Sequence, residues 1–197
     1  MREQTAASFQ SNEGLTMIEA SQIADLRYAS DDYEQTERLK TKLKRLRKER
    51  RPFFLTADEF DEILHWKLRQ QYGRQRHLRR YNTDELVRAV TGAALTISHK
   101  NKDYELELRV GILCALRGVG VPVASAILAL VYPEEYAVID YRAWRQVFSE
   151  ERTALSVGDY KRYMEAIRPL ARELGWPVQQ VDLAIWEYDR MHGPNLG

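Results

Sequence analysis

LCALRGVGVPVASAIL, residues 113–128, consists of two apolar segments separated by a short turn that contains Gly118 and Gly120. Glycine accepts positive φ and leaves the neighbouring backbone N–H groups uncovered. The turn therefore predicts a helical hairpin in which Val119 covers the contact between the two helices. Backbone amides at the start of the second helix attract an anion, and a DNA phosphate is the ligand that this geometry favours. The alternative is a glycine turn that connects two helices without binding phosphate.

The chain on both sides of this hairpin shows helical periodicity and no convincing strand pattern. Cap-plus-glutamate patterns at Thr56 and Asn82 and a similar pattern at Ser156 mark helix starts, and Gly73 marks a helix end. We expect helices over about residues 16–28, 31–50, 57–72, 83–98, 103–116, 121–131, 140–148 and 156–170, and a last one from about 177. The fold class is therefore all-α, a helix-hairpin-helix domain.

A chain of 197 residues with 44% hydrophobic residues is long enough to fold around one core. We expect a weakly ordered tail over residues 1–15 and a single helical domain over 16–197. That domain divides into three parts, which are a basic N-terminal part (31–80), the hairpin core (103–148) and C-terminal helices (156–191).

Composition excludes several classes of protein. One cysteine, Cys114, permits no internal disulfide and no four-cysteine iron–sulfur cluster. His65 and His77 have no partner at metal-ligand spacing, so we expect no metal and no cofactor. No apolar run is long enough for a bilayer, and the polar start lacks the apolar core of a secretory signal. These features favour a monomer in the reducing cytoplasm, without membrane contact.

The net charge of +1 conceals a strong asymmetry along the chain. Residues 1–37 hold eight acids and two bases, whereas residues 38–51 hold nine bases and one acid, and a second basic cluster follows at 67–80. Such clusters bind polyanions because each neutralised phosphate releases counterions; the alternative is a solvated helix face. We expect the DNA contacts to be Lys44, Arg45, Arg76, Arg79, Arg80 and Arg117, together with Gly118, Val119 and Gly120 of the hairpin.

Residues 113–147 resemble the helix-hairpin-helix DNA glycosylase superfamily, which includes endonuclease III and the adenine and 8-oxoguanine glycosylases. The resemblance rests on Leu116-x-Gly118-Val119-Gly120, Ala124, Ile127, Leu128, Val138-Ile139-Asp140 and Arg145. The stretches 136–144 and 181–186 are most similar to bacterial proteins with an 8-oxoguanine glycosylase fold. Bifunctional members of the superfamily carry a lysine where this chain has Pro122. The resemblance therefore implies base removal without lyase chemistry from that position.

The resemblance implies that Asp140 is the catalytic residue. Cleavage of an N-glycosidic bond builds positive charge on the sugar, and an adjacent carboxylate stabilises that charge and positions a water. Asp140 also precedes an apparent helix, and aspartate is a preferred N-cap, so a capping role is the alternative. The two roles are compatible.

Five further residues are candidates for the pocket that holds an everted base: Arg142, Arg145, Trp66, Lys67 and Tyr81. Arg145 has the alternative of holding an internal carboxylate, and Lys67 that of an amine nucleophile. Aromatic residues at such spacing are more often core, and Trp144, Trp176 and Trp186 are assigned to the core.

These observations predict a monofunctional DNA glycosylase that acts on double-stranded DNA and removes a damaged or modified base. A DNA-binding protein on the same fold, without catalysis, is the alternative. A third interpretation assigns the long basic helix a role in binding RNA or another protein.

Overall fold

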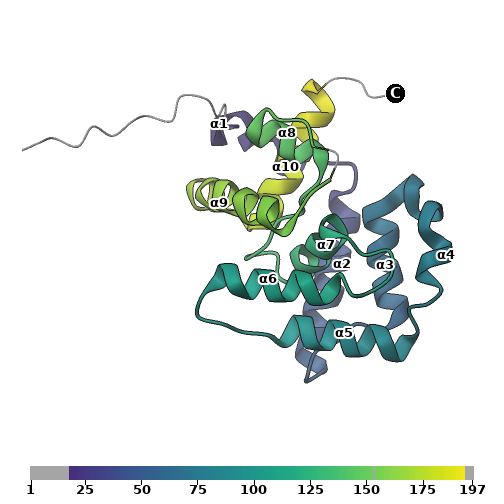
Figure 1. Cartoon of the computed structure of the whole chain (residues 1–197). Helices are drawn as coiled ribbons and strands as arrows, with labels where there is room; N and C mark the ends of the chain where they lie inside the picture. Colours follow the sequence, from purple (N-terminus) through teal and green to yellow (C-terminus); the bar gives the residue numbers. More distant parts are fainter. Residues whose placement is uncertain (1–17, 153, 194–197) are drawn as a thin grey trace, which may run out of the picture.

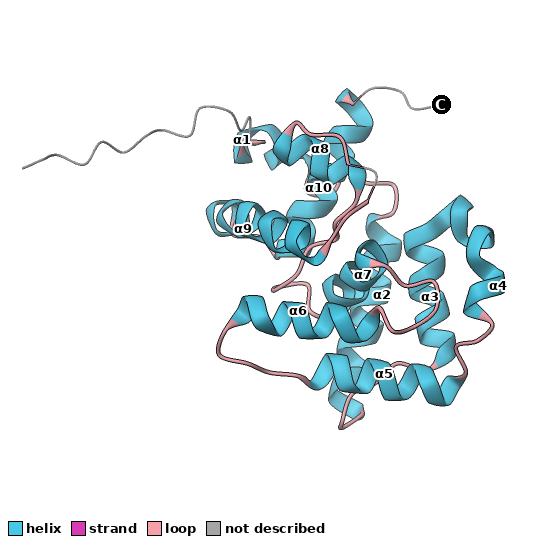
Figure 2. Ribbon diagram, in the orientation of Figure 1, coloured by secondary structure: helices cyan, strands magenta, loops and turns pink. Residues whose placement is uncertain are grey.

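The computed structural model describes residues 18–152 and 154–193, and within these ranges every regular element is a helix (Figure 2). The all-α class is therefore confirmed. The tail predicted over residues 1–15 lies outside the described residues. No helix within the described ranges has the length and hydropathy needed to cross a membrane.

The helices follow one another with short connections. They are α1 (Ala20–Ile23), α2 (Tyr33–Glu49), α3 (Ala57–Leu68), α4 (Arg76–Arg79), α5 (Asp84–Thr96), α6 (Lys102–Leu113), α7 (Val121–Val131), α8 (Tyr141–Phe148), α9 (Val157–Leu174) and α10 (Val178–His192). Two 3-10 helices, η1 (Ala24–Leu26) and η2 (Arg69–Gln75), continue α1 and α3.

The second helix of the hairpin, α7, lies at the centre of the molecule and packs against α2, α3, α6 and α10. Every side chain from Val123 to Val131 is buried, as expected for an 11-residue helix made of apolar and small residues. Figure 1 shows α1, α8, α9 and α10 together on one side of the molecule and α2 to α6 on the other. Contacts of α6 with α9 and of α7 with α10 join the two groups into one continuous core.

Most helix boundaries agree with the sequence prediction, because side-chain caps determine them. Thr56 and Ser156 cap α3 and α9 with complete capping boxes, and Asp140 caps α8. Two predictions were wrong. The helix predicted over 57–72 ends at Leu68, and the cap of α5 is Thr83, which leaves the Asn82 side chain free for a contact described below.

Candidate functional site

Asp140 lies at the end of an extended segment that α7 holds in place. The backbone N–H of Ile139 donates to Ser125 Oγ at 3.0 Å, and Ser125 Oγ donates to the carbonyl of Pro122 at 2.9 Å. Asp140 Oδ1 then accepts hydrogen bonds from the backbone amides of Arg142 at 3.1 Å and Ala143 at 3.0 Å. The hairpin and the acid are thus linked directly, and Asp140 performs the capping role that its position predicts.

The second carboxylate oxygen of Asp140 faces a lysine from a distant part of the chain. Lys67 Nζ, on the last turn of α3, lies 3.1 Å from Asp140 Oδ2. The Lys67 side chain is 12% exposed and that of Asp140 is 21% exposed. Burial acts to raise the pKa of the Asp140 carboxyl, but the Lys67 ammonium and the two backbone amides outweigh it and lower that pKa below its ordinary value. Asp140 is therefore a carboxylate at neutral pH.

A groove of about 580 Å³ opens beside Asp140, between the end of α3, the start of α8 and the last turns of α10. Pro122, the second residue of α7, lies on its edge, so the hairpin meets the groove through the first turn of α7. Five cationic side chains line this groove: Lys67, Arg69, Arg142, Arg152 and Arg190. Each also contacts a carboxylate, so the groove offers oriented donors whose positive charge is largely balanced.

A smaller cavity of about 60 Å³, called here the inner cavity, is also lined by Asp140. Asp140, Lys67, Arg69 and Trp186 line both spaces, so the inner cavity adjoins the groove. Its remaining lining residues are Trp66, Val138, Gln179, Asp182 and Leu183. The three lining residues of α10 that bear polar or aromatic groups, Gln179, Asp182 and Trp186, are spaced by three and four residues and share one helix face.

Asp182 is a second carboxyl group in the same cavity, and it is 6% exposed. Tyr163 of α9 donates its hydroxyl to Asp182 Oδ1 at 2.9 Å. Burial, followed by the negative charge of Asp140, raises the pKa of the Asp182 carboxyl to about 8. Two carboxyl groups in one cavity thus differ in charge at neutral pH, with Asp140 ionised and Asp182 protonated.

The chain turns sharply at the mouth of the inner cavity. Arg69, directly after α3, has φ 47° and ψ −121°, a backbone conformation that residues other than glycine rarely adopt. Its guanidinium group pairs with Asp32 and stacks over Trp186, 4.7 Å from the ring centroid. A strained backbone held by two tertiary contacts is typical of functional sites.

The hairpin turn uses its two glycines differently. Gly118 has φ 78°, a conformation that requires glycine, whereas Gly120 has φ −105° and is extended. The side chain of Asn82 holds the turn through two hydrogen bonds of 2.9 Å, accepting from the amide of Arg117 and donating to its carbonyl.

This contact places the end of the second basic cluster beside the hairpin. Arg76, Arg80 and Arg117 are exposed, and none has a carboxylate within 4.0 Å in the described part of the chain. Val119 is buried, as its predicted place over the contact between the two helices requires, so its side chain is not the surface DNA contact that the sequence predicted. Tyr81 is 58% exposed beside Arg80, and it lines neither the groove nor the inner cavity.

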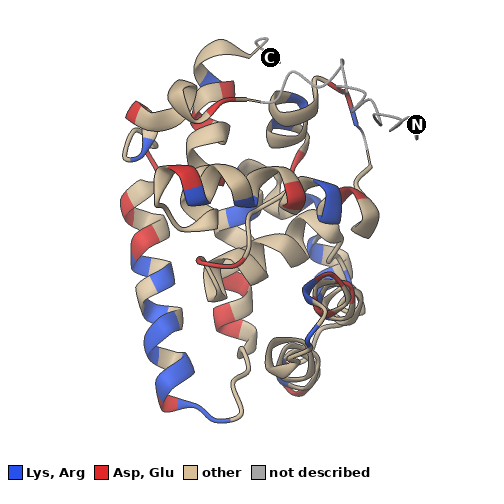
Figure 3. Cartoon of the chain, turned by 90° about the vertical axis from the view of Figure 1, so that its left-hand side faces the viewer, with Lys and Arg blue, Asp and Glu red and all other residues tan. Residues whose placement is uncertain are grey.

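The first basic cluster lies elsewhere. Arg47 of α2 donates to the carbonyl of Val131, the last residue of α7, at 2.8 Å. Lys44 and Arg45 are exposed on this half of α2, which Figure 3 shows as a basic run toward the end of the helix. Because α7 has 11 residues, its ends are about 16 Å apart. The structure therefore separates Lys44 and Arg45 from the hairpin turn, which is at the opposite end of α7.

Three assignments are corrected. Arg79 is only 8% exposed and donates to the carbonyl of Tyr72, so it is a buried residue and not a surface DNA contact. Arg145 makes a two-pronged ion pair with the buried Asp189, at 2.6 and 2.7 Å, which is the internal alternative. Trp186 is only half-buried and lines both spaces, so its assignment to the core is wrong.

The other candidates have varied positions. Trp144 is fully buried, as predicted, and Trp176 is half-buried against the core. Trp66 is buried, donates its indole N–H to Thr36 at 2.9 Å and lines the inner cavity. Arg142 lines the groove, where it lies 3.5 Å from Asp189.

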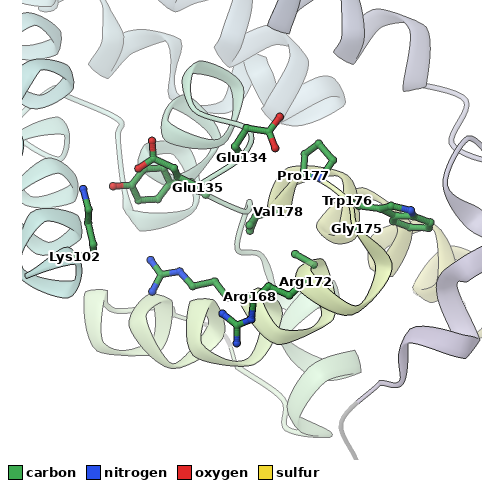
Figure 4. Close-up of a pocket in the computed structure, with 11 residues that line it drawn as sticks. Lys102, Glu134, Glu135, Arg168, Arg172, Gly175, Trp176, Pro177 and Val178 are labelled. Carbon is green, nitrogen blue, oxygen red and sulfur yellow. The ribbon is translucent and has the colours of Figure 1, made fainter.

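A larger cleft of about 720 Å³ lies away from this site, between the start of α6, the segment after α7 and the end of α9 (Figure 4). Its charged side chains are of both signs, with Lys102, Arg168 and Arg172 facing Glu134 and Glu135. Neither Asp140 nor the hairpin turn borders it. We therefore place the candidate site at Asp140.

Sequence reasoning missed Gln179, Asp182 and Arg69. The sequence contained a signal for Gln179 and Asp182. Both are polar residues among the apolar Val178, Val181 and Ile185 of one helix. An acid on an apolar helix face indicates a buried ionisable group. Arg69 gave no such signal, since its backbone conformation depends on its tertiary contacts.

Comparison of the chain with protein-family models, with curated proteins and with solved structures finds no match.

Proposed function

We propose that this protein is a monofunctional DNA glycosylase, which hydrolyses the N-glycosidic bond of a damaged or modified base in double-stranded DNA. The observation that carries the proposal is the position of Asp140, an ionised carboxylate at the border of the groove that the hairpin helix reaches. The resemblance of residues 113–147 to helix-hairpin-helix glycosylases supports the same role.

The chemistry needs a fixed negative charge beside the sugar. As the bond between the base and C1′ breaks, positive charge develops on the sugar ring, and a carboxylate that is already oriented stabilises it without reorganisation. The two amide hydrogen bonds and the Lys67 ion pair hold Asp140 in this way. A groove of about 580 Å³ is within the size range of pockets that hold small ligands.

Lys67 acts in this proposal as a positioning residue. An ammonium group that donates to a carboxylate carries its proton and has no free lone pair with which to attack C1′. Its contact with Asp140 therefore argues against the amine-nucleophile alternative. The same ion pair also favours the second candidate function, DNA binding without catalysis, because it neutralises Asp140 in the absence of substrate.

The experiment is a panel of duplexes, each with one altered base, scored for alkali-labile abasic sites. We expect the wild-type protein to release at least one base and Asp140→Asn to release none, with DNA affinity nearly unchanged. Asparagine caps a helix as well as aspartate does, so α8 is expected to remain intact. Asp84→Asn, at the start of α5 and outside the site, is the matched control and should keep full activity.

Full excision by Asp140→Asn would overturn the assignment of the catalyst. Salt-sensitive binding by the wild-type protein without abasic sites on any duplex would establish the non-catalytic alternative instead.

A further inference from the structure

The inner cavity contains two carboxyl groups with different partners. Asp140 pairs with Lys67, whereas Asp182 has no Lys, Arg or His nitrogen within 4.0 Å among the residues that the structure describes. The hydrogen-bond donors to Asp182 are neutral groups, the Tyr163 hydroxyl and the Val138 backbone N–H. A carboxylic acid that is buried and lacks a cation retains its proton more readily than one that is ion-paired.

Charged and titratable groups reach Asp182 from several elements. They line the inner cavity, contact its lining residues or interact with the charge of Asp182. These groups are Asp140, Lys67, Arg69, Asp32, Arg142, Tyr160, Tyr163 and, behind Gln179, Lys40. Burial, followed by the negative charge of Asp140, opposes ionisation of Asp182, whereas the hydrogen bonds from Tyr163 and Val138 and the charge of Lys67 favour it less strongly. Two interacting carboxyl groups whose environments separate their pKa values form an acid and base pair.

Gln179 gives an independent indication that a polar group belongs in this cavity. Its side chain is fully buried, and Oε1 accepts a hydrogen bond of 2.9 Å from Lys40 Nζ. Because Lys40 is only a donor, this contact orients the amide so that Nε2 is the free end. Nε2 has no hydrogen-bond partner in the described structure, and Gln179 lines the inner cavity. A buried donor without a partner is costly unless a further group accepts its hydrogen bond.

The volume of the cavity indicates the size of that group. About 60 Å³ is less than half of the cavity of about 150 Å³ that admits a benzene ring, and it is room for about two waters. The inner cavity is therefore too small for a nucleobase but large enough for an ordered water beside Gln179, Asp182 and Asp140. These three side chains supply the two to four polar contacts that an ordered water needs.

We propose that Asp182 is the proton source for the departing base, and that a water held by Gln179 in the inner cavity carries the proton. This inference rests on the proposed function. Asp182 is thereby the acid, Asp140 the charged stabiliser and Gln179 a positioning residue.

The step is balanced. The Asp182 carboxyl gives its proton to the bridging water, which passes one of its own protons to a nitrogen or oxygen atom of the base. The bond between C1′ and the base nitrogen breaks, and its electron pair leaves with the base, which is released neutral. A second water adds to C1′, and the proton that it loses returns through the bridging water to the Asp182 carboxylate. The net reaction consumes one water and regenerates the acid.

The test compares leaving groups that need a proton with one that does not. Single-turnover release is measured from pH 5 to 9.5 on a duplex with a neutral altered base and on one with N7-methylguanine, a base that is already positively charged. We expect Asp182→Asn to release the neutral base at least about 100-fold more slowly than the wild type, and the cationic base within about threefold of it. The wild-type rate on the neutral base should fall above about pH 8, the pKa of Asp182.

Two further variants make the result specific. Gln179→Met should slow release of the neutral base and keep the decline in rate above about pH 8, because the acid is still present. Glu59→Gln, a buried carboxyl on α3 that lines neither the inner cavity nor the groove, should match the wild type on both duplexes. Circular dichroism and melting temperature establish that each variant is folded.

The remaining outcomes distinguish failure of the role of Asp182 from failure of the proposed function. If Asp182→Asn slows release equally on both duplexes, or does not slow release of the neutral base, the role of Asp182 is overturned and the proposed function stays in place. If the cationic base is no substrate, a wild-type rate on the neutral base that stays constant to pH 9.5 overturns it. No release of any base by the wild type overturns the proposed function and this role together.

Discussion

At the scale of single residues, environment and not residue type determines what the two acids of the site do. Asp140 lies at a helix N-terminus beside an ammonium group, and both favour the ionised form. Asp182 lies within a helix with a phenol as its donor, and its surroundings favour the neutral form. The charge of each acid therefore affects a measurable property, stability or rate, as the pH changes.

The raised pKa of Asp182 predicts a dependence of stability on pH. Its carboxyl titrates at about 8 in the folded chain and near 3.9, roughly, in an unfolded chain. The folded state thus holds an extra proton between these values, so the stability that this group contributes is complete below about pH 4 and is lost as the pH rises to about 8. Asp182→Asn removes this loss. Relative to the wild type, the variant should gain up to about 1.4 kcal/mol per pH unit between pH 5 and 8.

Urea unfolding at pH 5, 6.5 and 8 measures this difference. A gap between the two proteins that stays constant across the three pH values would show that Asp182 is ionised in the folded state.

Removal of Lys67 tests the ion pair from the other side. In Lys67→Met the Asp140 carboxylate loses the cation that lowers its pKa, so that pKa rises and the acid limb of the excision rate moves to higher pH. Breaking a largely buried pair should also destabilise the fold by about 3 kcal/mol. Lys42→Met breaks an exposed pair with Glu62 and should change stability by less than about 1 kcal/mol.

pH–rate profiles and urea unfolding of both variants give the two readouts. An acid limb at the wild-type pH in Lys67→Met would contradict the effect assigned to Lys67.

At the scale of elements, the α6–α7 hairpin depends on Gly118 in the turn more than on Gly111 in α6. Gly118 has a left-handed conformation. Gly111, two residues before the end of α6, is exposed, and a Cβ added there would meet no atom within 4 Å. The same substitution at these two positions should therefore have opposite effects.

Gly118→Ala should destabilise the protein by about 1–2 kcal/mol, because an L side chain strains the left-handed conformation. Gly111→Ala should stabilise it by about 0.5–1 kcal/mol, because alanine loses less backbone entropy within a helix. Thermal unfolding of the two variants measures the difference. A gain in stability for Gly118→Ala would show that the turn does not have the conformation described here.

At the scale of the whole molecule, the fold sorts the two basic clusters by their distance from the hairpin. The end of the second cluster contacts the turn through Asn82, whereas Lys44 and Arg45 are near the far end of α7. A duplex bound at the hairpin therefore meets Arg80 and Arg117 first. It reaches the α2 residues only if it extends along the whole of α7.

A pair of double variants tests the proposed DNA binding and the cluster that carries it. Arg80→Gln/Arg117→Gln should weaken duplex binding and lower the slope of log affinity against log salt by about 2 units, roughly one for each lost phosphate contact. Lys44→Gln/Arg45→Gln removes the same charge and should have a smaller effect. Fluorescence anisotropy from 50 to 300 mM salt, roughly the range where this dependence is strong, compares them. A larger effect of the α2 pair would place the DNA on α2.

The sequence by itself determined the features that depend on neighbouring residues. The apolar and small residues of 121–131 were sufficient to predict α7, and Asp140 was sufficient to predict the start of α8, because caps and periodicity act within one or two turns. The all-helical class and the turn at Gly118 followed from the same local rules.

Only the tertiary structure decided which side chains share the site. Lys67 meets Asp140 across 73 residues of chain, and α10 brings Asp182 and Gln179 to the same cavity. Arg145 points into the interior because it pairs with the buried Asp189. The basic residues of α2 lie away from the hairpin turn because the apolar face of α2 packs on α7. Such contacts depend on packing between helices distant in sequence, and a local pattern carries no information about the partner.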